Sequence, residues 1–479
     1  MNQHTVTFLP GGKTVRVEPG TDLLQAQIRA GLRPDAPCGG KGTCGKCKVM
    51  LEGREVLACQ TKVDRDMTVT TEKEESVRIL MEGQTVAGKA DGTDKYVIAF
   101  DIGTTTVVAY LLDGCSGNLL AQASAMNPQS QYGADVISRI QLVLKENTAV
   151  LRDAIRSAME ELTRQAAEKA GIGVEEITAA AIVGNTAMHH LMLGIDPKPL
   201  VTPPYMPAVF EAMEVGTGCR ARILPNIAGF VGGDTVGCLV STRFDRMEEL
   251  TLLIDIGTNG EMVLGDQNRR IACSTAAGPA FEGAKISCGM RGAEGAVDHV
   301  WLENGTVQYH VIGETAPVGL CGSGLLDLVA VLLEMGIIDE SGRLERKEYR
   351  LCDNVVLTQK DVREVQLAKA AIRAGIELLA RQLGVAVSGI RQVLLAGAFG
   401  SYMDPRSACH IGMIPPVLVD RIKAIGNAAG EGAKLCAISR GEFTYSQNLA
   451  KHTEFLELAS LPDFQDCYVD ALEFEEEEE

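Results

Sequence analysis

The stretch YVIAFDIGTTTVVAYLLD, residues 96–113, has a near copy later in the chain, TLLIDIGTNGEMVLGD, residues 251–266. In each stretch an apolar run ends in Asp-Ile-Gly-Thr and a second apolar run follows, which predicts two strands joined by a tight turn. An internal duplication of this kind predicts two similarly folded halves with a cleft between them.

The turn of each repeat carries groups suited to phosphate and Mg²⁺. Gly103 lets the backbone approach phosphate oxygens, and the threonines after it can donate N–H and O–H groups. Asp101 is suited to hold Mg²⁺ through water, because this ion keeps much of its hydration shell. Asp255 repeats the arrangement in the second half. The nucleotide-binding residues predicted in the two turns are Gly103, Thr104, Thr105, Thr106, Gly257, Thr258 and Asn259.

Three Gly-containing segments accompany the repeats. FVGGDTVGCLVST, residues 230–242, and GNAAGEGAKLCAIS, residues 426–439, predict two small-residue helices that can cross closely at a hinge. VLLAGAFGSYMDP, residues 393–405, predicts a buried strand and a turn suited to an adenosine. The adenosine contacts predicted in this turn are Gly397, Ala398, Phe399 and Gly400.

The five motifs together resemble the superfamily of acetate and sugar kinases, heat-shock chaperone ATPases and actin. The likeness covers residues 96 to about 440 and implies an actin-like ATPase domain of two lobes, each RNase H-like. It also implies three catalytic residues, in which Asp234 positions the attacking water or Mg²⁺ beside Asp101 and Asp255. A helix N-cap is the alternative role for Asp234.

The N-terminal part has a different pattern. Residues 4–18 alternate apolar and polar side chains, which predicts a β-hairpin. Thr21 is expected to cap the amphipathic helix that follows. Short strands around Val49 and Val56 complete a β-grasp ferredoxin. The predicted fold class is therefore α+β in this domain and α/β in the ATPase domain.

Four cysteines have the spacing C-x5-C-x2-C-x11-C: Cys38, Cys44, Cys47 and Cys59. Four thiolates are what a [2Fe–2S] cluster needs, and the Gly, Thr and Lys residues between them let the loop wrap closely. A structural zinc site is the alternative, although such sites usually pair two short C-x-x-C units. The spacing also resembles that of adrenodoxin-type ferredoxins. The remaining cysteines are expected to be small buried hydrophobes.

The composition divides the chain into five parts. They are a ferredoxin domain (1–72), a polar linker (73–95), ATPase lobe I (96–248), ATPase lobe II with C-terminal helices (249–470) and an acidic, solvated tail (471–479). The formal net charge of −18 argues against nucleic acid and anionic membranes as partners. The N-terminus lacks the pattern of a signal peptide, and the chain is expected to be cytoplasmic.

Four further segments point to one group of ATPases: GNTAMHHLMLG from Gly184, STAAGPAFEGA from Ser274, GLCGSGLLDLV from Gly319 and TQKDVREVQLAKAAIRAGI from Thr358. With the ferredoxin domain, they resemble the reductive activators of corrinoid proteins, which restore Co(II) to Co(I) in methyl-transferring systems. The resemblance implies ATP and Mg²⁺, one-electron transfer from the cluster to a corrinoid protein, an upstream low-potential donor and a homodimer.

Other interpretations stay open. The family is expected to carry a longer linker and a middle domain before the ATPase, whereas here the linker leads directly into the first repeat. The alternatives are an activator of another low-potential metalloenzyme, a small-molecule kinase with a redox-sensing ferredoxin domain, and a binding scaffold. His189 and His190 are expected to pack and cap rather than bind metal. The Ser274 loop is expected on the phosphate side, the alternative being that it faces a partner's cofactor.

Overall fold

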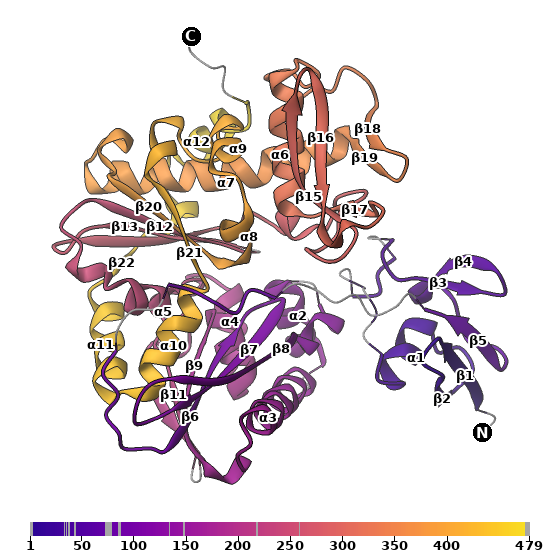
Figure 1. Ribbon diagram of the computed structural model, residues 1–479, viewed down its shortest axis with the longest axis horizontal. Coiled ribbons are helices and arrows are strands. Elements are labelled where there is room, and N and C mark those ends of the chain that lie inside the picture. Colours follow the sequence, from indigo (N-terminus) through magenta and orange to yellow (C-terminus); the bar gives the residue numbers. More distant parts are fainter. Residues whose placement is uncertain are drawn as a thin grey trace.

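The structure is a computed structural model that describes residues 3–32, 34, 36, 39–42, 45–71, 79–84, 88–133, 135–146, 149–216, 219–257 and 259–474. Three predicted site residues, Cys38, Cys44 and Thr258, lie outside these ranges. Figure 1 shows a small N-terminal domain beside a larger body of two lobes, one above the other.

The N-terminal domain is a five-stranded sheet in the order β2-β1-β5-β3-β4, with one helix packed on it. β1 pairs antiparallel with β2 and parallel with β5, which is the mixed pairing of the predicted β-grasp fold. Its elements are β1 (His4–Leu9), β2 (Lys13–Val17), α1 (Leu23–Arg29), β3 (Lys48–Leu51), β4 (Arg54–Leu57), η1 (Ala58–Gln60) and β5 (Met67–Thr70).

The cap of helix α1 differs from the prediction. Asp22, and not Thr21, is the N-cap, because the Asp22 carboxylate accepts a 2.8 Å hydrogen bond from the backbone N–H of Gln25. A carboxylate at this place is stabilised by the positive end of the helix as well as by the hydrogen bond. The Thr21 hydroxyl instead donates to the carbonyl of Glu18, at 2.8 Å.

Lobe I is built on a six-stranded sheet in the order β10-β11-β9-β6-β7-β8. Its elements are β6 (Tyr96–Ile102), β7 (Thr106–Asp113), β8 (Leu119–Met126), η2 (Pro128–Gln131), α2 (Val136–Glu146), α3 (Val150–Ala170), η3 (Val174–Glu176), β9 (Ile177–Gly184), α4 (Thr186–Leu193), η4 (Lys198–Val201), β10 (Met213–Val215), β11 (Arg220–Ile223), α5 (Gly233–Thr242) and η5 (Phe244–Arg246).

Lobe II has a second six-stranded sheet, in the order β21-β20-β12-β13-β14-β22. This sheet and its near neighbours comprise β12 (Thr251–Ile256), β13 (Gly260–Gly265), β14 (Arg270–Thr275), η6 (Ala280–Glu282), η8 (Val387–Gly389), β20 (Gln392–Ala396), α8 (Gly397–Tyr402), α9 (Pro405–His410), η9 (Pro416–Arg421), β21 (Ile422–Gly426) and β22 (Glu454–Phe455).

The rest of lobe II, within the described residues, adds two small sheets, five α-helices and two short 3-10 helices to this framework. These elements are β15 (Ala296–Glu303), β16 (Thr306–Val311), η7 (Ile312–Glu314), β17 (Gly319–Leu320), α6 (Gly322–Glu334), β18 (Glu348–Cys352), β19 (Val355–Thr358), α7 (Gln359–Leu383), α10 (Ala428–Ile438), α11 (Arg440–Lys451), η10 (Leu458–Ser460) and α12 (Phe464–Asp470). Phe474, inside the predicted acidic tail, is buried and donates its N–H to the carbonyl of Glu340. Residues 475–479 of that tail lie outside the described residues.

The two lobes repeat one topology. In lobe I, β6 is parallel to β9 and antiparallel to β7, which is antiparallel to β8. In lobe II, β12 is parallel to β20 and antiparallel to β13, which is antiparallel to β14. The duplicated, actin-like architecture predicted from the two Asp-Ile-Gly-Thr stretches is therefore confirmed.

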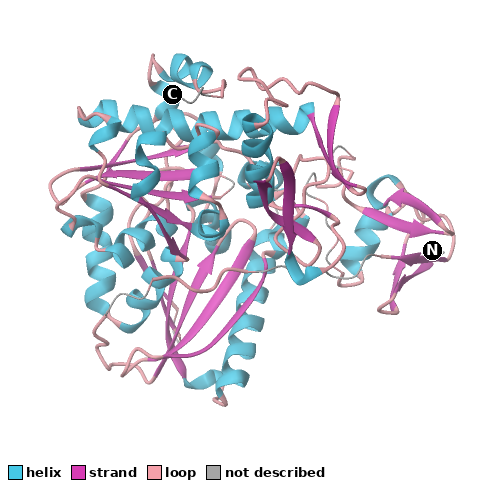
Figure 2. Ribbon diagram, turned by 45° about the horizontal axis from the view of Figure 1, so that its top comes forward, coloured by secondary structure: helices cyan, strands magenta, loops and turns pink. Residues whose placement is uncertain are grey.

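Helices α5 and α10 cross between the two sheets and share one apolar core with strands of both lobes. Figure 2 shows how helices surround and separate the sheets of this body. The crossing is close because it lacks side chains: a Cβ on Gly432 of α10 would lie 2.1 Å from the carbonyl oxygen of Gly237 of α5. The small-residue helices predicted from the sequence thus meet where the lobes join.

We expect Gly432→Ala to destabilise the protein, because a Cβ at this position forces the two helices apart. Overpacking of a tight core costs roughly 1–3 kcal/mol, which thermal unfolding measures as a lower midpoint. The matched control is Gly441→Ala in α11, where the nearest atom to an added Cβ is the Ser439 hydroxyl at 3.4 Å. Equal stability of the two variants would contradict the close crossing.

Part of the predicted linker packs on the ATPase body. Residues 79–84, here called the strap, run beside the end of β21, and Gly83 forms an antiparallel bridge with Gly426. The Gly83 N–H donates to the Glu431 carboxylate at 3.2 Å, and the Tyr110 hydroxyl donates to the carbonyl of Met81 at 2.7 Å. The strap therefore contacts both lobes and helix α10.

Candidate functional site

The first candidate site is the cysteine-containing loop of the N-terminal domain, residues 38–47, here called the cluster loop. Cys47 precedes β3 and Cys59 lies in η1, and both side chains are buried. The N–H of Ala58 donates to the carbonyl of Cys47 at 2.7 Å, so two of the four predicted ligands are held side by side. Cys38 and Cys44 lie outside the described residues.

Glycines shape the cluster loop around these cysteines. Gly40 has a φ of +82°, and a Cβ there would lie 3.8 Å from Cβ of Cys59. Gly42 has a φ of +74°, and a Cβ there would lie 2.6 Å from the side-chain nitrogen of Gln60. Only glycine adopts such backbone angles without strain while approaching so closely. The loop thus fits an iron–sulfur cluster, whose ligands must be wrapped tightly by backbone.

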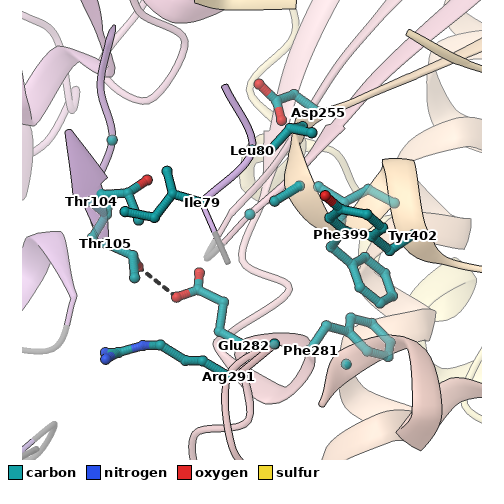
Figure 3. Close-up of a pocket in the computed structure, with 18 of the residues that line it drawn as sticks. Ile79, Leu80, Thr104, Thr105, Asp255, Phe281, Glu282, Arg291, Phe399 and Tyr402 are labelled. Atoms are coloured by element: carbon teal, nitrogen blue, oxygen red, sulfur yellow. Dashed lines mark hydrogen bonds between the residues drawn. The ribbon is translucent and has the colours of Figure 1, made fainter. Parts of the chain in front are cut away.

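The second candidate site is a cavity of about 300 Å³ between the two lobes. Its size falls at the lower end of the range for small-molecule sites. Nine of the predicted nucleotide-binding residues line it: Gly103, Thr104, Thr105, Thr106, Gly257, Asn259, Gly397, Ala398 and Phe399. Gly400 does not, since it packs against Leu395 beneath the turn. The structure therefore brings both repeat turns and the predicted adenosine turn to one cavity (Figure 3).

All three predicted catalytic carboxylates also line the cavity, and so does Glu261, which lies opposite one of them. Asp101 ends β6, Asp255 ends β12, and Asp234 lies in the first turn of α5, where Gly232 is the N-cap. The alternative role of Asp234 as the helix N-cap is therefore excluded. Glu261, which the sequence prediction missed, pairs across the second hairpin with Asp255.

Burial makes ionisation of these carboxylates costly. It raises the pKa of Asp101 to about 6, although a 2.7 Å hydrogen bond from the Asn427 amide opposes the shift. Burial, followed by repulsion from neighbouring carboxylates, raises the pKa of Asp234 to about 6 and that of Asp255 to about 7. The same causes raise the pKa of Glu261 well above its usual value. A cavity of this kind gains stability when a cation enters it.

The affinity for Mg²⁺ with a nucleotide should therefore fall as the pH is lowered through about 7 to 6. Since the folded-state pKa values of Asp101 and Asp255 are raised, these groups are protonated at low pH and must lose protons to face a cation. Each proton released weakens binding by roughly tenfold per pH unit below the pKa. Because their pKa values are raised, the same carboxyl groups stabilise the metal-free fold most at low pH, where they are protonated. This stabilisation is lost as the pH rises and the groups ionise. Calorimetry across this range checks the prediction, and a constant affinity would contradict it.

Two asparagine side chains form hydrogen bonds with the first repeat turn and the aspartate before it. Asn185, the N-cap of α4, donates its amide to the Thr104 hydroxyl at 3.0 Å. Asn427, the N-cap of α10, donates to Asp101 and also to the Tyr110 hydroxyl, at 3.1 Å. Each helix thus places its start, where N–H groups point outward, beside the turn expected to hold phosphates.

The opposite end of the cavity is aromatic. Phe281 and Phe399 stack with ring centroids 4.6 Å apart and planes 12° apart. Gly397, with a φ of +81°, would place a Cβ 2.5 Å from the Asp255 carboxylate. Glycine at this position therefore lets the turn that follows β20 approach Asp255, the second of the predicted catalytic carboxylates. This end is suited to the flat, apolar face of a base.

Three of the residues that line the cavity bring together parts of the chain that are distant in the sequence. Figure 3 shows Ile79 and Leu80 of the strap between Thr104 and Asp255. Glu282 accepts a 2.7 Å hydrogen bond from the Thr105 hydroxyl, which joins lobe II to lobe I. The sequence prediction included neither contact, because both depend on how the lobes face each other.

The paired histidines are buried and pack inside the fold, as expected, but the N-cap of their helix is Asn185 and neither histidine. His189 Nδ1 lies 2.5 Å from the Asn226 amide, and His190 Nε2 accepts from the N–H of Ala208 at 3.0 Å. Burial lowers the pKa of both side chains, that of His189 to about 4. In the loop after Ser274, Glu282 contacts Thr105 of the first repeat turn, which supports the expected place of this loop on the phosphate side, while Phe281 lies at the aromatic end.

Within the described ranges, no three His, Cys, Asp or Glu side chains are arranged to bind a metal ion among themselves. None of the described helices combines the length and the apolar character that crossing a membrane requires.

Comparison with protein families covers nearly all of the chain. Residues 6–67 match the 2Fe-2S iron-sulfur cluster binding domain, residues 96–247 the RACo middle region, and residues 249–479 the C-terminal domain of RACo, the ASKHA domain. The match to the middle region corrects one expectation: no middle domain precedes lobe I, because lobe I is that domain.

Comparison with individual proteins agrees with the family matches. The corrinoid activation enzyme RamQ of Eubacterium limosum is 32% identical over 557 aligned positions, covering 92% of this chain and 94% of that protein. The [Co(II) methylated amine-specific corrinoid protein] reductase of Methanosarcina barkeri is 28% identical, covering 56% of this chain and 54% of its own. Among solved structures, a reductive activator for corrinoid,iron-sulfur protein superposes with a TM-score of 0.71 at 29% identity, covering 98% of both chains.

Proposed function

This chain belongs to the RACo family of ferredoxin-fused ATPases, the reductive activators of corrinoid proteins, and from this we propose its reaction. It transfers one electron from its iron–sulfur cluster to the Co(II) corrinoid of a methyltransferase partner and so regenerates Co(I). ATP hydrolysis accompanies the transfer. The observation that carries the proposal is that one chain, aligned over 92% of its length with a corrinoid activation enzyme, contains both a cluster loop and a carboxylate-lined cavity between lobes.

The cluster is of the [2Fe–2S] type, held by Cys38, Cys44, Cys47 and Cys59. When bound, it supplies a one-electron carrier of low potential, about −400 mV for plant-type clusters. The chain's own contribution is to hold the thiolates and to exclude water, with Cys47 and Cys59 buried. The match of residues 6–67 to a cluster-binding domain favours an iron–sulfur cluster over zinc.

The cavity binds ATP with Mg²⁺. Thr104 to Thr106 donate to the phosphates, and Phe281 and Phe399 contact the base. Asp101 and Asp255 hold Mg²⁺ through its water shell, and Asp234 positions the attacking water. Each ~59 mV of uphill electron transfer costs about 1.4 kcal/mol, which closure of the lobes around ATP can offset by changing the partner's cobalt ligation.

The test is anaerobic reduction of a candidate Co(II) corrinoid protein by the reduced holoprotein, with and without ATP. The visible spectrum of the corrinoid should show Co(I) in much higher yield with ATP. A yield that does not depend on ATP would refute the proposal. Radioactive phosphate appearing on a sugar or small acid would instead favour the kinase alternative.

Three finer expectations remain proposals of the same kind. The protein is a cytoplasmic homodimer joined through its ATPase domain, and an upstream low-potential protein reduces its cluster. Size determination by light scattering tests the dimer, and cluster reduction by candidate ferredoxins tests the donor.

A further inference from the structure

The cluster loop is docked on lobe II by Lys46, the residue that precedes Cys47. The ammonium group of Lys46 donates to the carbonyl of Gly289 at 2.7 Å and lies 3.4 Å from that of Ile286. On the other side of the loop, a Cβ at Gly39 would lie 3.8 Å from the carbonyl oxygen of Tyr132 in lobe I. The cluster loop thus contacts both lobes.

The lobe II segment that receives Lys46, residues 286–292 and here called the docking loop, also borders the nucleotide cavity. Its last three residues, Met290, Arg291 and Gly292, line that cavity. The docking loop is held at its centre by β17, since the N–H of Met290 donates to the carbonyl of Leu320 at 2.8 Å. One short loop therefore touches the cluster domain with its first half and the nucleotide cavity with its second.

The docking loop is packed directly against the turn that carries Glu282. A Cβ on Gly283 would lie 2.4 Å from the carbonyl oxygen of Met290, and one on Gly289 would lie 2.3 Å from the carbonyl oxygen of Gly283. Backbones this close cannot move independently. A displacement of Glu282 must therefore shift the carbonyl of Gly289, which Lys46 contacts.

Glu282 is itself held by Thr105, a residue that is expected to bind a phosphate. Its carboxylate accepts from the Thr105 hydroxyl at 2.7 Å, and Thr105 is in the first repeat turn. Figure 3 shows this bond, with Arg291 extending beside it. A bound triphosphate needs the hydroxyl and N–H donors of this turn and brings several negative charges close to the Glu282 carboxylate. In a partly buried site such charges repel each other more strongly than they do in water.

The covalent connection of the cluster domain reaches the same cavity. Ile79 and Leu80 of the strap line it, and the strap leads back toward β5 of the N-terminal domain. Two of the attachments of the cluster domain, the strap and the docking loop, thus line the cavity.

We propose that the docking loop is a nucleotide-controlled docking site for the chain's own cluster loop, and that binding of a nucleoside triphosphate releases it. The triphosphate takes the Thr105 hydroxyl and repels Glu282, and the turn and the docking loop shift together. The Lys46 contacts with Gly289 and Ile286 are then lost, and the cluster is free to reach a partner. This inference rests on the proposed function, because it requires the cavity to bind ATP.

Chemical labelling of lysine amines reports the contact directly. The anaerobic holoprotein is treated briefly with an acetylating reagent, with and without a saturating non-hydrolysable ATP analogue, and the ratio of acetylation at Lys46 to that at Lys48 is measured by mass spectrometry. Lys48 is the internal reference, because it pairs with Glu55 inside its own domain at 2.9 Å. We expect the ratio to rise roughly tenfold with the analogue, the usual worth of one charge-assisted hydrogen bond.

Two variants test the route. Glu282→Gln keeps an acceptor for Thr105 but removes the charge, so the rise in the ratio should be largely lost while calorimetry still detects the analogue. Glu303→Gln, at the exposed end of β15, is the matched control and should keep the full rise. If Glu282→Gln does not fold, Thr105→Val should give a raised ratio without analogue, because it removes the bond that holds Glu282.

Each outcome decides the matter. An unchanged ratio at an analogue concentration that calorimetry shows to be saturating overturns the inference and leaves the proposed function standing. No binding of the analogue overturns both. A raised ratio together with ATP-independent cobalt reduction supports the docking site while refuting the proposed function.

Discussion

Asp255→Asn should lower the rate of ATP hydrolysis by roughly 10²–10³-fold, the usual loss on removing one fixed electrostatic group from a catalytic site. The side chain keeps its shape, so the change removes charge alone. Asp255 ends β12, faces Glu261 across the hairpin and lies within reach of the turn after β20. Its pKa, raised to about 7 by burial and by Asp234 and Asp101, shows that the fold supports this charge at a cost, which a cation offsets.

The measurement is the steady-state rate of phosphate release from the anaerobic holoprotein. Asp266→Asn is the matched control, because Asp266 lies at the far end of the same hairpin and caps a local turn with its carboxylate. We expect the control to hydrolyse ATP at the unchanged rate, and both variants to keep the visible spectrum of the cluster. Unimpaired hydrolysis by Asp255→Asn would remove the second repeat from the catalytic site.

The sequence was sufficient for the repeat turns because their pattern is local. An apolar strand followed by Asp-Ile-Gly-Thr and a second apolar strand can form only a hairpin that presents the aspartate at its end. The antiparallel pairing of β6 with β7 and of β12 with β13 confirms this. The same geometry would have found Glu261: the pairing of the two strands of this hairpin places Glu261 opposite Asp255, in a strand whose other side chains are apolar.

The supporting asparagines could also have been predicted. Gly184-Asn185-Thr186-Ala187 and Gly426-Asn427-Ala428-Ala429 repeat one pattern, in which a strand ends at glycine and asparagine caps the next helix. Asparagine is among the preferred N-cap residues. Because the two halves are duplicates, a cap in one half indicates a cap in the other. The pattern gives no indication that one amide reaches Thr104 and the other Asp101, since the first contact depends on tertiary packing inside lobe I and the second joins residues of the two lobes.

The position of the strap could not be predicted from local sequence patterns. Residues 79–84 follow a charged stretch and have neither the period of a helix nor that of a strand, which favours a linker. Their position is set by backbone pairing with the end of β21 and by the Tyr110 hydroxyl, and both of these partners lie far away in the sequence. The apolar pair Ile79 and Leu80 inside a polar linker was the available signal.

Cys59→Ser should abolish cluster-dependent reduction of the corrinoid partner. A [2Fe–2S] cluster needs four thiolates, and a serine hydroxyl in this apolar place is not an adequate replacement. Cys59 is buried in η1, next to the Cys47 segment through the bond from Ala58 to the Cys47 carbonyl. We expect the purified variant to lose its visible absorption and most of its iron, and cobalt reduction to fall to the background of an assay without protein.

The effect should be confined to the electron path. ATP hydrolysis should persist, because the cavity residues belong to the two lobes and the strap, and none of them belongs to the N-terminal domain. Cys115→Ser is the matched control, since Cys115 is exposed in the turn after β7; it should keep iron, absorption and both activities. Retention of a full complement of iron by Cys59→Ser would exclude Cys59 as a ligand. Hydrolysis that continues without electron transfer would place the two chemistries at separate sites, whose coupling then depends on contacts between the domains.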